Sequence, residues 1–172
     1  DNLKTDSDAK FEKNYTLHID DIAPQVSWGT NPGMTIDVTE SIPSPDDFAK
    51  GDQNQKKGAE KALEYMNLKS GTPITEIKID RVFIGSCTNA RISDLREAAK
   101  ILKGKKVSIP TIITPGSQLV KRQAEKEGLH DIFQDAGALW THSSCGPCLG
   151  MSMGVVAPES RCISSTNRNF PG

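Results

Sequence analysis

Long hydrophobic runs are missing from this sequence. No segment approaches the roughly 20 consecutive apolar residues that a membrane-spanning helix needs, and no signal peptide is recognisable. Charge of one sign is not concentrated either, because the 21 basic and 22 acidic residues are spread along the chain and give a formal net charge of −1. We therefore expect no membrane contact and no nucleic-acid partner, since a nucleic-acid partner requires a clustered basic surface.

Cysteine is also scarce, with four residues in a chain of 172. In a chain without a secretion signal, closely spaced thiols are more often ligands or redox centres than structural disulfides. We therefore expect a reducing compartment, with the cytoplasm as the location. The length allows one good hydrophobic core and a smaller appendage, and a hydrophobic share of 35% with 25% charged residues is ordinary for a soluble protein.

The N-terminal part of the chain shows little regular periodicity. Residues 1–13 are largely charged and polar, so we expect a loose arm. Tyr15, Leu17 and Ile19 then alternate with polar residues, which predicts a short, half-buried strand. Residues 24–45 contain four prolines and two glycines, which exclude a continuous helix or a central strand and indicate a linker or a binding loop.

These features predict a division of the chain at about residue 50. Residues 1–50 are expected to form an extended arm and linker that continues from a missing upstream domain, and residues 51–172 are expected to form a compact lobe. The chain opens on Asp1 and closes on the letters NRNFPG, which read as part of an active-site loop. We therefore expect the sequence to be a piece of a longer protein.

Strands and helices alternate beyond residue 50. Apolar residues at helical spacing predict helices, runs rich in isoleucine and valine predict strands, and glycine, proline and serine mark the turns between them. The predicted helices cover 55–67, 92–102, a segment ending near 128, and 129–136, and the predicted strands cover 77–84, 109–113, 138–140 and 162–165. This order predicts an α/β fold with a mainly parallel sheet, right-handed crossovers and helices that cover the sheet.

Three segments rich in reactive side chains each follow a predicted strand. They are GSCTN at 85–89, SSCGPC at 143–148 and STNRN at 165–169. In parallel sheets, ligands gather in the crevice beyond the carboxyl ends of the strands. We therefore expect the three segments to meet at one edge of the sheet.

The cysteines in these segments allow several kinds of chemistry. Cys87 is followed by a predicted helix, whose positive N-terminal end favours a thiolate. The pair Cys145 and Cys148 resembles a thioredoxin-like redox motif, or it forms a zinc site with Cys87 and either His142 or Cys162. Three thiols also suit an iron-sulfur cluster in which they bind three of the irons and leave the remaining iron open to substrate. Cys162 lies within a strand pattern, which favours a place in the core.

Arg168 is the candidate substrate anchor. It stands between two asparagines, and its planar guanidinium binds a carboxylate through two hydrogen bonds. The same arginine in an isolated TNRN turn would be an ordinary exposed surface residue, so the neighbouring motifs decide between the two interpretations.

Four motifs in register carry a specific resemblance. GSCTNARISDLREAA, TPGS followed by a helix, CGPCLG and STNRNF, in this order, resemble the aconitase superfamily, in particular the large subunits of 3-isopropylmalate dehydratase. The similarity runs from about Tyr15 to Gly172. The segment PQVSWGTNPGM also resembles the isopropylmalate enzymes, whereas CGPC is similar to aconitase and homoaconitase. The resemblance implies a three-layer α/β/α domain like the iron-sulfur domain of aconitase.

The resemblance also implies roles for individual residues. Cys87, Cys145 and Cys148 match the three ligands of a four-iron four-sulfur (4Fe-4S) cluster. Asn167 and Arg168 match the residues that bind the substrate, a small hydroxy-dicarboxylic acid. No catalytic base falls within the chain, and the partner is expected to be a small subunit that carries the swivelling domain.

The implied activity is that of a hydro-lyase that isomerises 2-isopropylmalate and 3-isopropylmalate in leucine biosynthesis. The isolated fragment is expected to be inactive and to lose its cluster, because one side of the cleft is missing. The alternatives are a homoaconitase or aconitase type of hydratase, a zinc-stabilised structural domain, and an RNA-binding regulator.

Overall fold

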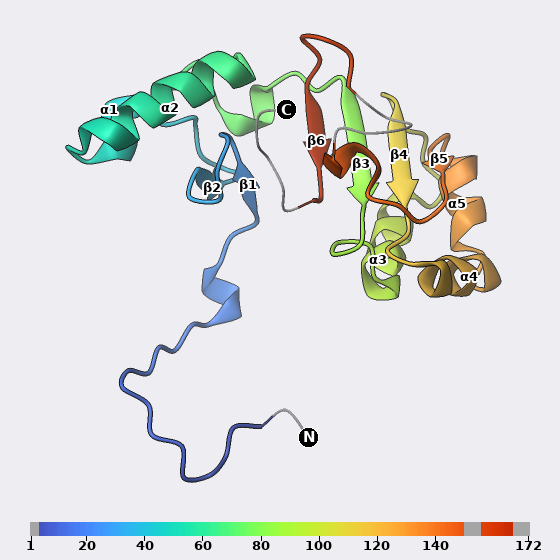
Figure 1. Ribbon diagram of the computed structural model, residues 1–172. Coiled ribbons are helices and arrows are strands. Elements are labelled where there is room, and N and C mark those ends of the chain that lie inside the picture. The colour runs from blue at the N-terminus through green and yellow to red at the C-terminus, as the bar shows by residue number, and fades with distance from the viewer. Residues whose placement is uncertain (1–3, 150–155, 167–172) are drawn as a thin grey trace.

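The centre of the fold is a four-stranded parallel sheet with the strand order β5-β4-β3-β6 (Figure 1). The computed structural model describes residues 4–149 and 156–166. The strands are β3 (Arg81–Gly85), β4 (Thr111–Thr114), β5 (Leu139–Trp140) and β6 (Cys162–Ser164), and each pair is parallel. The predicted α/β class with a parallel sheet is confirmed.

One face of this sheet is covered by three helices that the sequence predicted. They are α3 (Ile92–Leu102), α4 (Gln118–Lys126) and α5 (Leu129–Asp135). The sheet core, as we name this cluster, buries the following residues: Ala90, Leu95, Ala99, Ile113, Ala124, Leu129, Phe133 and Ala138. Within residues 4–149 and 156–166, no helix is long and apolar enough to cross a membrane.

The opposite face of the sheet carries a short 3-10 turn, η3 (Gly146–Leu149), in place of a helix. Phe83 of β3 is 1% exposed, and a methyl group placed on Gly146 would lie 3.6 Å from Cζ of its ring. Figure 1 shows this turn in front of β3. In the part of the chain that the structure describes, the expected second helical layer is therefore reduced to this turn and the loops beside it.

A second, smaller core lies beside the sheet. It is built by an antiparallel hairpin of β1 (Gln25–Ser27) and β2 (Thr35–Asp37), by α1 (Pro45–Ala49) and α2 (Gln53–Met66), and by the turn η2 (Ile74–Glu76). This N-terminal core buries Trp28, Met34, Ile42, Ala59, Ala62 and Leu63. The Trp28 ring meets that of Phe48 edge to face, with centroids 5.3 Å apart.

The N-terminal core changes the division expected at residue 50. Residues 25–49 pack with α2, whereas the sequence grouped them with an extended linker. Their apolar side chains are separated by prolines and glycines, so they show no period of two or 3.6. Long-range contacts such as that between Trp28 and Phe48 bring them together.

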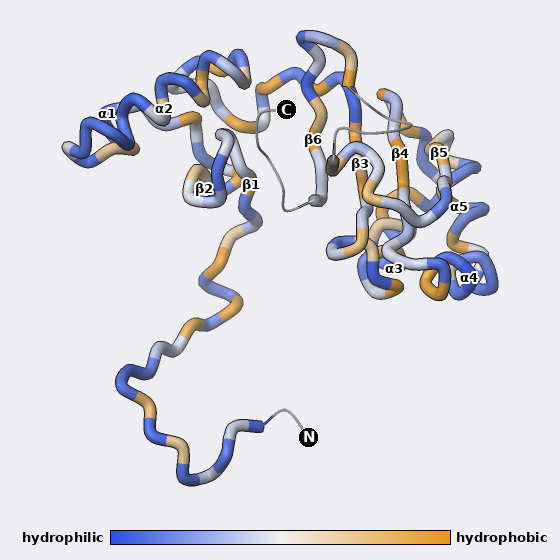
Figure 2. The backbone as a smooth tube through the Cα atoms, in the orientation of Figure 1, coloured by the Kyte–Doolittle hydropathy of each residue, from blue (hydrophilic) through white to orange (hydrophobic). Residues whose placement is uncertain are grey.

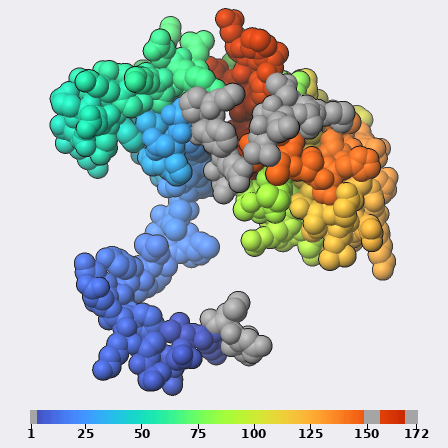
Figure 3. Space-filling view, in the orientation of Figure 1, coloured from blue at the N-terminus to red at the C-terminus, as the bar shows by residue number. Residues whose placement is uncertain are grey.

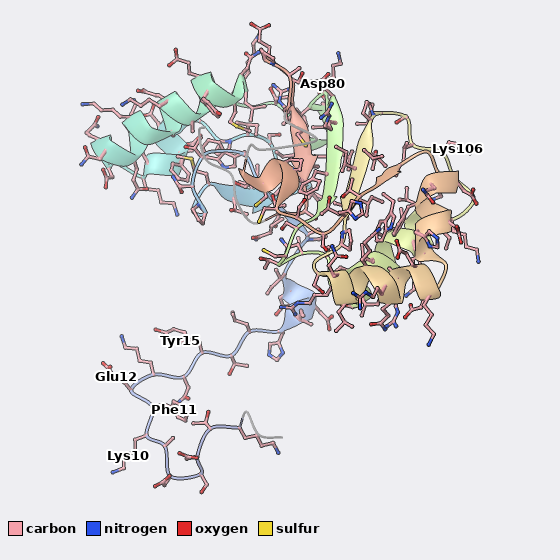
Figure 4. All side chains as sticks on the ribbon, turned by 45° about the vertical axis from the view of Figure 1, so that its right-hand side comes forward. Lys10, Phe11, Glu12, Tyr15, Asp80 and Lys106 are labelled. Carbon is pink, nitrogen blue, oxygen red and sulfur yellow. The ribbon has the colours of Figure 1, made fainter. Side chains whose placement is uncertain are left out.

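Residues 4–24 extend away from both cores as an arm, which Figures 3 and 4 show leaving the folded body. The arm contains one short turn, η1 (Ile19–Asp21). The strand predicted at residues 15–19 is wrong, because Tyr15, Leu17 and Ile19 are 82%, 81% and 83% exposed and no described strand pairs with them. Figure 2 shows apolar and polar residues interleaved along the arm. Alternation alone does not make a strand where no neighbouring strand supplies hydrogen bonds.

Arg161 joins the two cores. Its guanidinium donates hydrogen bonds to the carbonyl oxygens of Met66 (3.1 Å), Asn67 (2.9 Å) and Lys78 (2.9 Å), and its backbone amide donates to Asp80 Oδ2 (2.9 Å). The side chain thus connects the end of α2 with the starts of β3 and β6. Figure 4 labels Asp80 at this end of the sheet. The amide of Arg161 holds the pKa of the Asp80 carboxyl below its usual range, with Lys78 adding a smaller electrostatic contribution.

Candidate metal and substrate site

The loops after β3, β4 and β5 contact one another at the carboxyl edge of the sheet. The register pairs Gly85 with Thr114, so β3 and β4 end side by side. The hydroxyl oxygens of Thr114 and Thr141 lie 2.7 Å apart and link the ends of β4 and β5. The amide of Gly116 donates to the carbonyl of Ala90 at 3.0 Å, which links the TPGS turn to the loop after β3. The parallel topology therefore gathers the predicted loops at one edge.

Two glycines allow this close approach of loops. Gly85 has φ +148°, and a side chain there would run into the backbone of Thr114. A methyl group on Gly116 would lie 2.9 Å from the carbonyl oxygen of Ala90. Ser86, immediately before the first candidate ligand, is 1% exposed and has φ +74°, a left-handed conformation that is costly for a residue with a side chain. The chain thus turns sharply out of β3 just before Cys87.

Ser165 ties the loop after β6 to the loop after β3. Its amide donates to the carbonyl of Phe83 at 3.0 Å, and its hydroxyl accepts from the amide of Gly85 at 2.9 Å. Its carbonyl accepts a hydrogen bond from the side-chain amide of Asn89. The sequence placed Asn89 and Ser165 within motifs, but it gave neither a role, because spacing does not show that the two residues touch.

Cys87 is exposed, and its sulfur lies 3.7 Å from the hydroxyl oxygen of Thr88. The helix predicted to follow at 92–102 is confirmed as α3, which begins at Ile92. The amide of Arg91 donates to Asp94 Oδ2 at 2.9 Å, so the helix end carries its own acidic partner. Residues 88–91 therefore lie between the exposed Cys87 thiol and the start of α3.

Cys145 and Cys148 flank one turn of the 3-10 helix. The amide of Cys148 donates to the carbonyl of Cys145 at 3.1 Å, and residues three apart in such a turn lie on the same side. Both thiols are half-buried. Because Gly146 between them packs against Phe83, the turn sits over the strand that leads to Cys87.

The two further candidates for a zinc site differ in their distance from this edge. Cys162 pairs with Arg81 at the amino end of the sheet, four residues before Gly85, which is roughly 13 Å along a strand. Burial raises the pKa of the Cys162 thiol, an effect partly offset by the nearby positive charge of Arg81. His142 is exposed in the loop after β5. The register therefore separates Cys162 from the loops that carry the other thiols.

The donor set at the carboxyl edge fits a thiolate-bound cluster by its chemistry. All four cysteines are free, and three of them lie in loops that follow β3 and β5. Ser143, two residues before Cys145, has a buried hydroxyl that finds no partner among the described residues, and such a group is a ready donor to sulfur. No three His, Cys, Asp or Glu side chains in residues 4–149 and 156–166 are close enough together to hold a metal. Ligation by all three thiols would therefore require the Cys87 loop and η3 to approach each other.

The predicted substrate residues Asn167 and Arg168 lie outside the described residues. They follow directly after Thr166, whose amide donates to the hydroxyl of Ser164 at 3.0 Å. The described chain thus reaches the start of the STNRN motif, and the two roles stay predictions.

Fold and candidate site together define a class of protein: an α/β domain whose parallel sheet carries thiol-bearing loops at its carboxyl edge. The family model of the aconitase family (aconitate hydratase) matches residues 2–172. The chain belongs to the aconitase family, and its chemistry is that of an aconitase-type hydro-lyase. The resemblance to the aconitase superfamily is thereby confirmed.

Proposed function

We propose that this chain is the cluster-binding lobe of a 3-isopropylmalate dehydratase, a hydro-lyase that interconverts 2-isopropylmalate and 3-isopropylmalate in leucine biosynthesis. Membership of the aconitase family supports the reaction class. The segment PQVSWGTNPGM at 24–34 supports the substrate, because it resembles the isopropylmalate enzymes. The free thiols are consistent with a reducing compartment, and we place the protein in the cytoplasm.

The observation that carries the proposal is the meeting of loops at one edge of the sheet. The loop with Cys87 and the loop that leads into Asn167 and Arg168 are joined through Ser165. The turn between Cys145 and Cys148 packs over the same central strand. A hydro-lyase of this type needs its metal centre and its substrate carboxylate site side by side, and this topology supports that arrangement.

In the proposed enzyme, Cys87, Cys145 and Cys148 would hold a 4Fe-4S cluster. When bound, such a cluster supplies a Lewis-acidic iron for a substrate hydroxyl. Arg168 would bind a substrate carboxylate through paired, charge-assisted hydrogen bonds, and Asn167 would help to orient it. The proton-abstracting base would come from another domain or from a small subunit with a swivelling domain, so the isolated chain is expected to be inactive.

A second substrate class is favoured by one feature of the sequence. The CGPC motif at 145–148 resembles aconitase and homoaconitase, whose substrates are tricarboxylic acids. Reconstitution with a small subunit, followed by assays with isopropylmalate, homocitrate and citrate, would distinguish the two classes. Preferential turnover of homocitrate or citrate would contradict the isopropylmalate assignment.

Anaerobic reconstitution with iron and sulfide tests the cluster directly. We expect a brown product with broad visible absorption for the unmodified chain. Replacement of Cys87, Cys145 or Cys148 by serine should abolish stable cluster binding, because serine is a poor substitute for a thiolate ligand. Cys162→Ser is the matched control and should retain the absorption, since Cys162 lies at the opposite end of the sheet.

The reconstitution also separates the proposal from the other classes of function. A colourless protein that binds zinc tightly would indicate a structural metal site. Loss of the cluster in Cys162→Ser with retention in Cys87→Ser would contradict the ligand set. A salt-dependent shift of RNA in a gel, without cluster binding, would indicate a nucleic-acid-binding regulator.

A further inference from the structure

The loop that carries Cys87 and the loop that follows β6 are held together at one point. Ser165 receives hydrogen bonds from Gly85 and Asn89 and donates one to Phe83. Cys87 lies between Gly85 and Asn89 in the sequence. A displacement of Ser165 therefore acts on both sides of the residue that would be the first cluster ligand.

The side chain of Asn89 donates a hydrogen bond to the loop after β6 where the backbone hydrogen bonds between β3 and β6 end. The β3–β6 pairing covers Arg81 to Phe83, and the left-handed conformation of Ser86 then turns the chain away from β6. The amide of Gly85, at the end of β3, donates to the hydroxyl of Ser165 and not to its carbonyl. The primary amide of Asn89 resembles a peptide group and supplies the missing donor.

We propose that Asn89 and Ser165 are positioning residues that couple the thiol loop to the substrate-carboxylate loop. The inference rests on the proposed function, because it takes the residues after Thr166 as the carboxylate site. The coupling is reciprocal: a dicarboxylate held after β6 stabilises the Ser165 contacts and thereby changes the accessibility of Cys87. Neither residue needs to touch the substrate or the cluster.

Hydrogen exchange on the reduced, metal-free chain tests the positioning role. Two amide protons are informative. The amide of Gly85 donates to the Ser165 hydroxyl, and the amide of Ser165 donates to the carbonyl of Phe83. Asn89→Asp keeps the size of the side chain but replaces its donor by a carboxylate facing a carbonyl. We expect both amides to exchange roughly tenfold faster in this variant.

The controls separate positioning from general loss of stability. Gln25→Glu removes a comparable amide donor, which bonds to Asp37 across the hairpin of the other core at 3.2 Å, and should leave both amides unchanged. Ser165→Ala should mimic Asn89→Asp for the Gly85 amide, and Ser165→Thr should restore protection because it keeps the hydroxyl. Unchanged exchange of either amide in Asn89→Asp would overturn the inference.

A second measurement tests the coupling and separates it from the proposed function. The alkylation rate of Cys87 by iodoacetamide is followed by mass spectrometry with and without 2-isopropylmalate. We expect the dicarboxylate to slow alkylation roughly fivefold in the unmodified chain and to have no such effect in Asn89→Asp. An equal slowing in both chains would overturn the coupling.

The variant Arg168→Met identifies which proposal has failed. If isopropylmalate slows alkylation equally in this variant, the arginine is not the carboxylate anchor and the proposed substrate site is wrong. The hydrogen-exchange result then still decides whether Asn89 and Ser165 hold the two loops together, because that measurement uses neither substrate nor cluster.

Discussion

Replacing Arg161 by methionine should loosen the joint between the N-terminal core and the sheet core. Methionine keeps an apolar stem of similar length but removes every donor of the guanidinium. The lost hydrogen bonds are those to Met66 (3.1 Å), Asn67 (2.9 Å) and Lys78 (2.9 Å). These bonds join the end of α2 to the segments that lead into β3 and β6, so the loss should act on the joint and not within either core.

The magnitude follows from the exposure of the three acceptors. The bond to Met66 is partly buried, and a charged donor at such a site contributes about 3 kcal/mol. The bonds to Asn67 and Lys78 are exposed, so water replaces them at a loss of about 1 kcal/mol each. Holding the arginine side chain in place costs roughly 2 kcal/mol of conformational entropy, and the variant does not incur this cost. The expected destabilisation of the joint is therefore about 3 kcal/mol.

The two tryptophans report on the two cores separately. Trp28 is 2% exposed in the N-terminal core, and Trp140 packs against the sheet core with its ring centroid 5.7 Å from that of Phe133. Urea unfolding is followed by fluorescence in Trp28→Phe and Trp140→Phe backgrounds. We expect Arg161→Met to lower the Trp28-detected midpoint strongly and the Trp140-detected midpoint less, so that the two transitions separate.

The control for this experiment is Arg122→Met, which removes an exposed arginine from α4. It should change stability by less than about 0.5 kcal/mol. The reasoning fails if Arg161→Met changes the free energy of unfolding reported by each tryptophan by no more than that limit. It also fails if both tryptophans report the same large shift, because the two cores would then unfold as one unit without regard to the joint.

Three further predictions concern single sites. Gly85→Ala should destabilise the fold by roughly 3 kcal/mol or more, because the added methyl group would meet the backbone of β4. The control Gly71→Ala adds a methyl group in open space at φ +79°, so thermal unfolding should show a loss of only about 1 kcal/mol. The lowered pKa of Asp80 stabilises the fold above the unfolded pKa of about 4 and loses its effect as pH falls through the folded value. Asp80→Asn should therefore flatten the acid limb of a pH–stability curve; an unchanged limb would refute this. Because burial raises the pKa of Cys162, this thiol should alkylate more slowly at pH 8 than exposed Cys87, and equal rates by mass spectrometry would count against it.

Local sequence patterns predicted most of the sheet and its helices. In α3, the residues Leu95 and Ala99 are buried as the helical spacing required, and Ser117 caps α4 by accepting from the amide of Val120 at 3.2 Å. These features depend on residues within one or two turns of each other. Local periodicity and capping signals are therefore sufficient to locate them.

The N-terminal core and the arm show where such patterns fail. Trp28 and Phe48 lie in a stretch broken by prolines, and their packing depends on a partner 20 residues away, which no local period encodes. In the arm, the alternation of Tyr15 and Leu17 is as regular as in a true strand. The missing element is a neighbouring strand, and this cannot be read from the alternating segment itself.

The candidate site was predictable in its location but not in its connections. The order of strands placed Cys87 and the Cys145–Cys148 turn at one edge, because parallel strands end together. The contacts of Asn89, Ser165 and Arg161 were not predictable, since each joins residues roughly 80 positions or more apart. Motif spacing reports which residues are present and not which backbone groups they satisfy.

The strand order has a consequence for synthesis on the ribosome. Strands β3, β4 and β5 leave the exit tunnel in sequence and are able to pair at once, but the other edge of β3 stays open until residues 162–164 emerge. At a translation speed of roughly 5–20 residues per second, this interval lasts on the order of seconds. During that time the nascent chain presents an unpaired edge beside the Phe83 ring, an attractive target for a chaperone or for a neighbouring nascent chain.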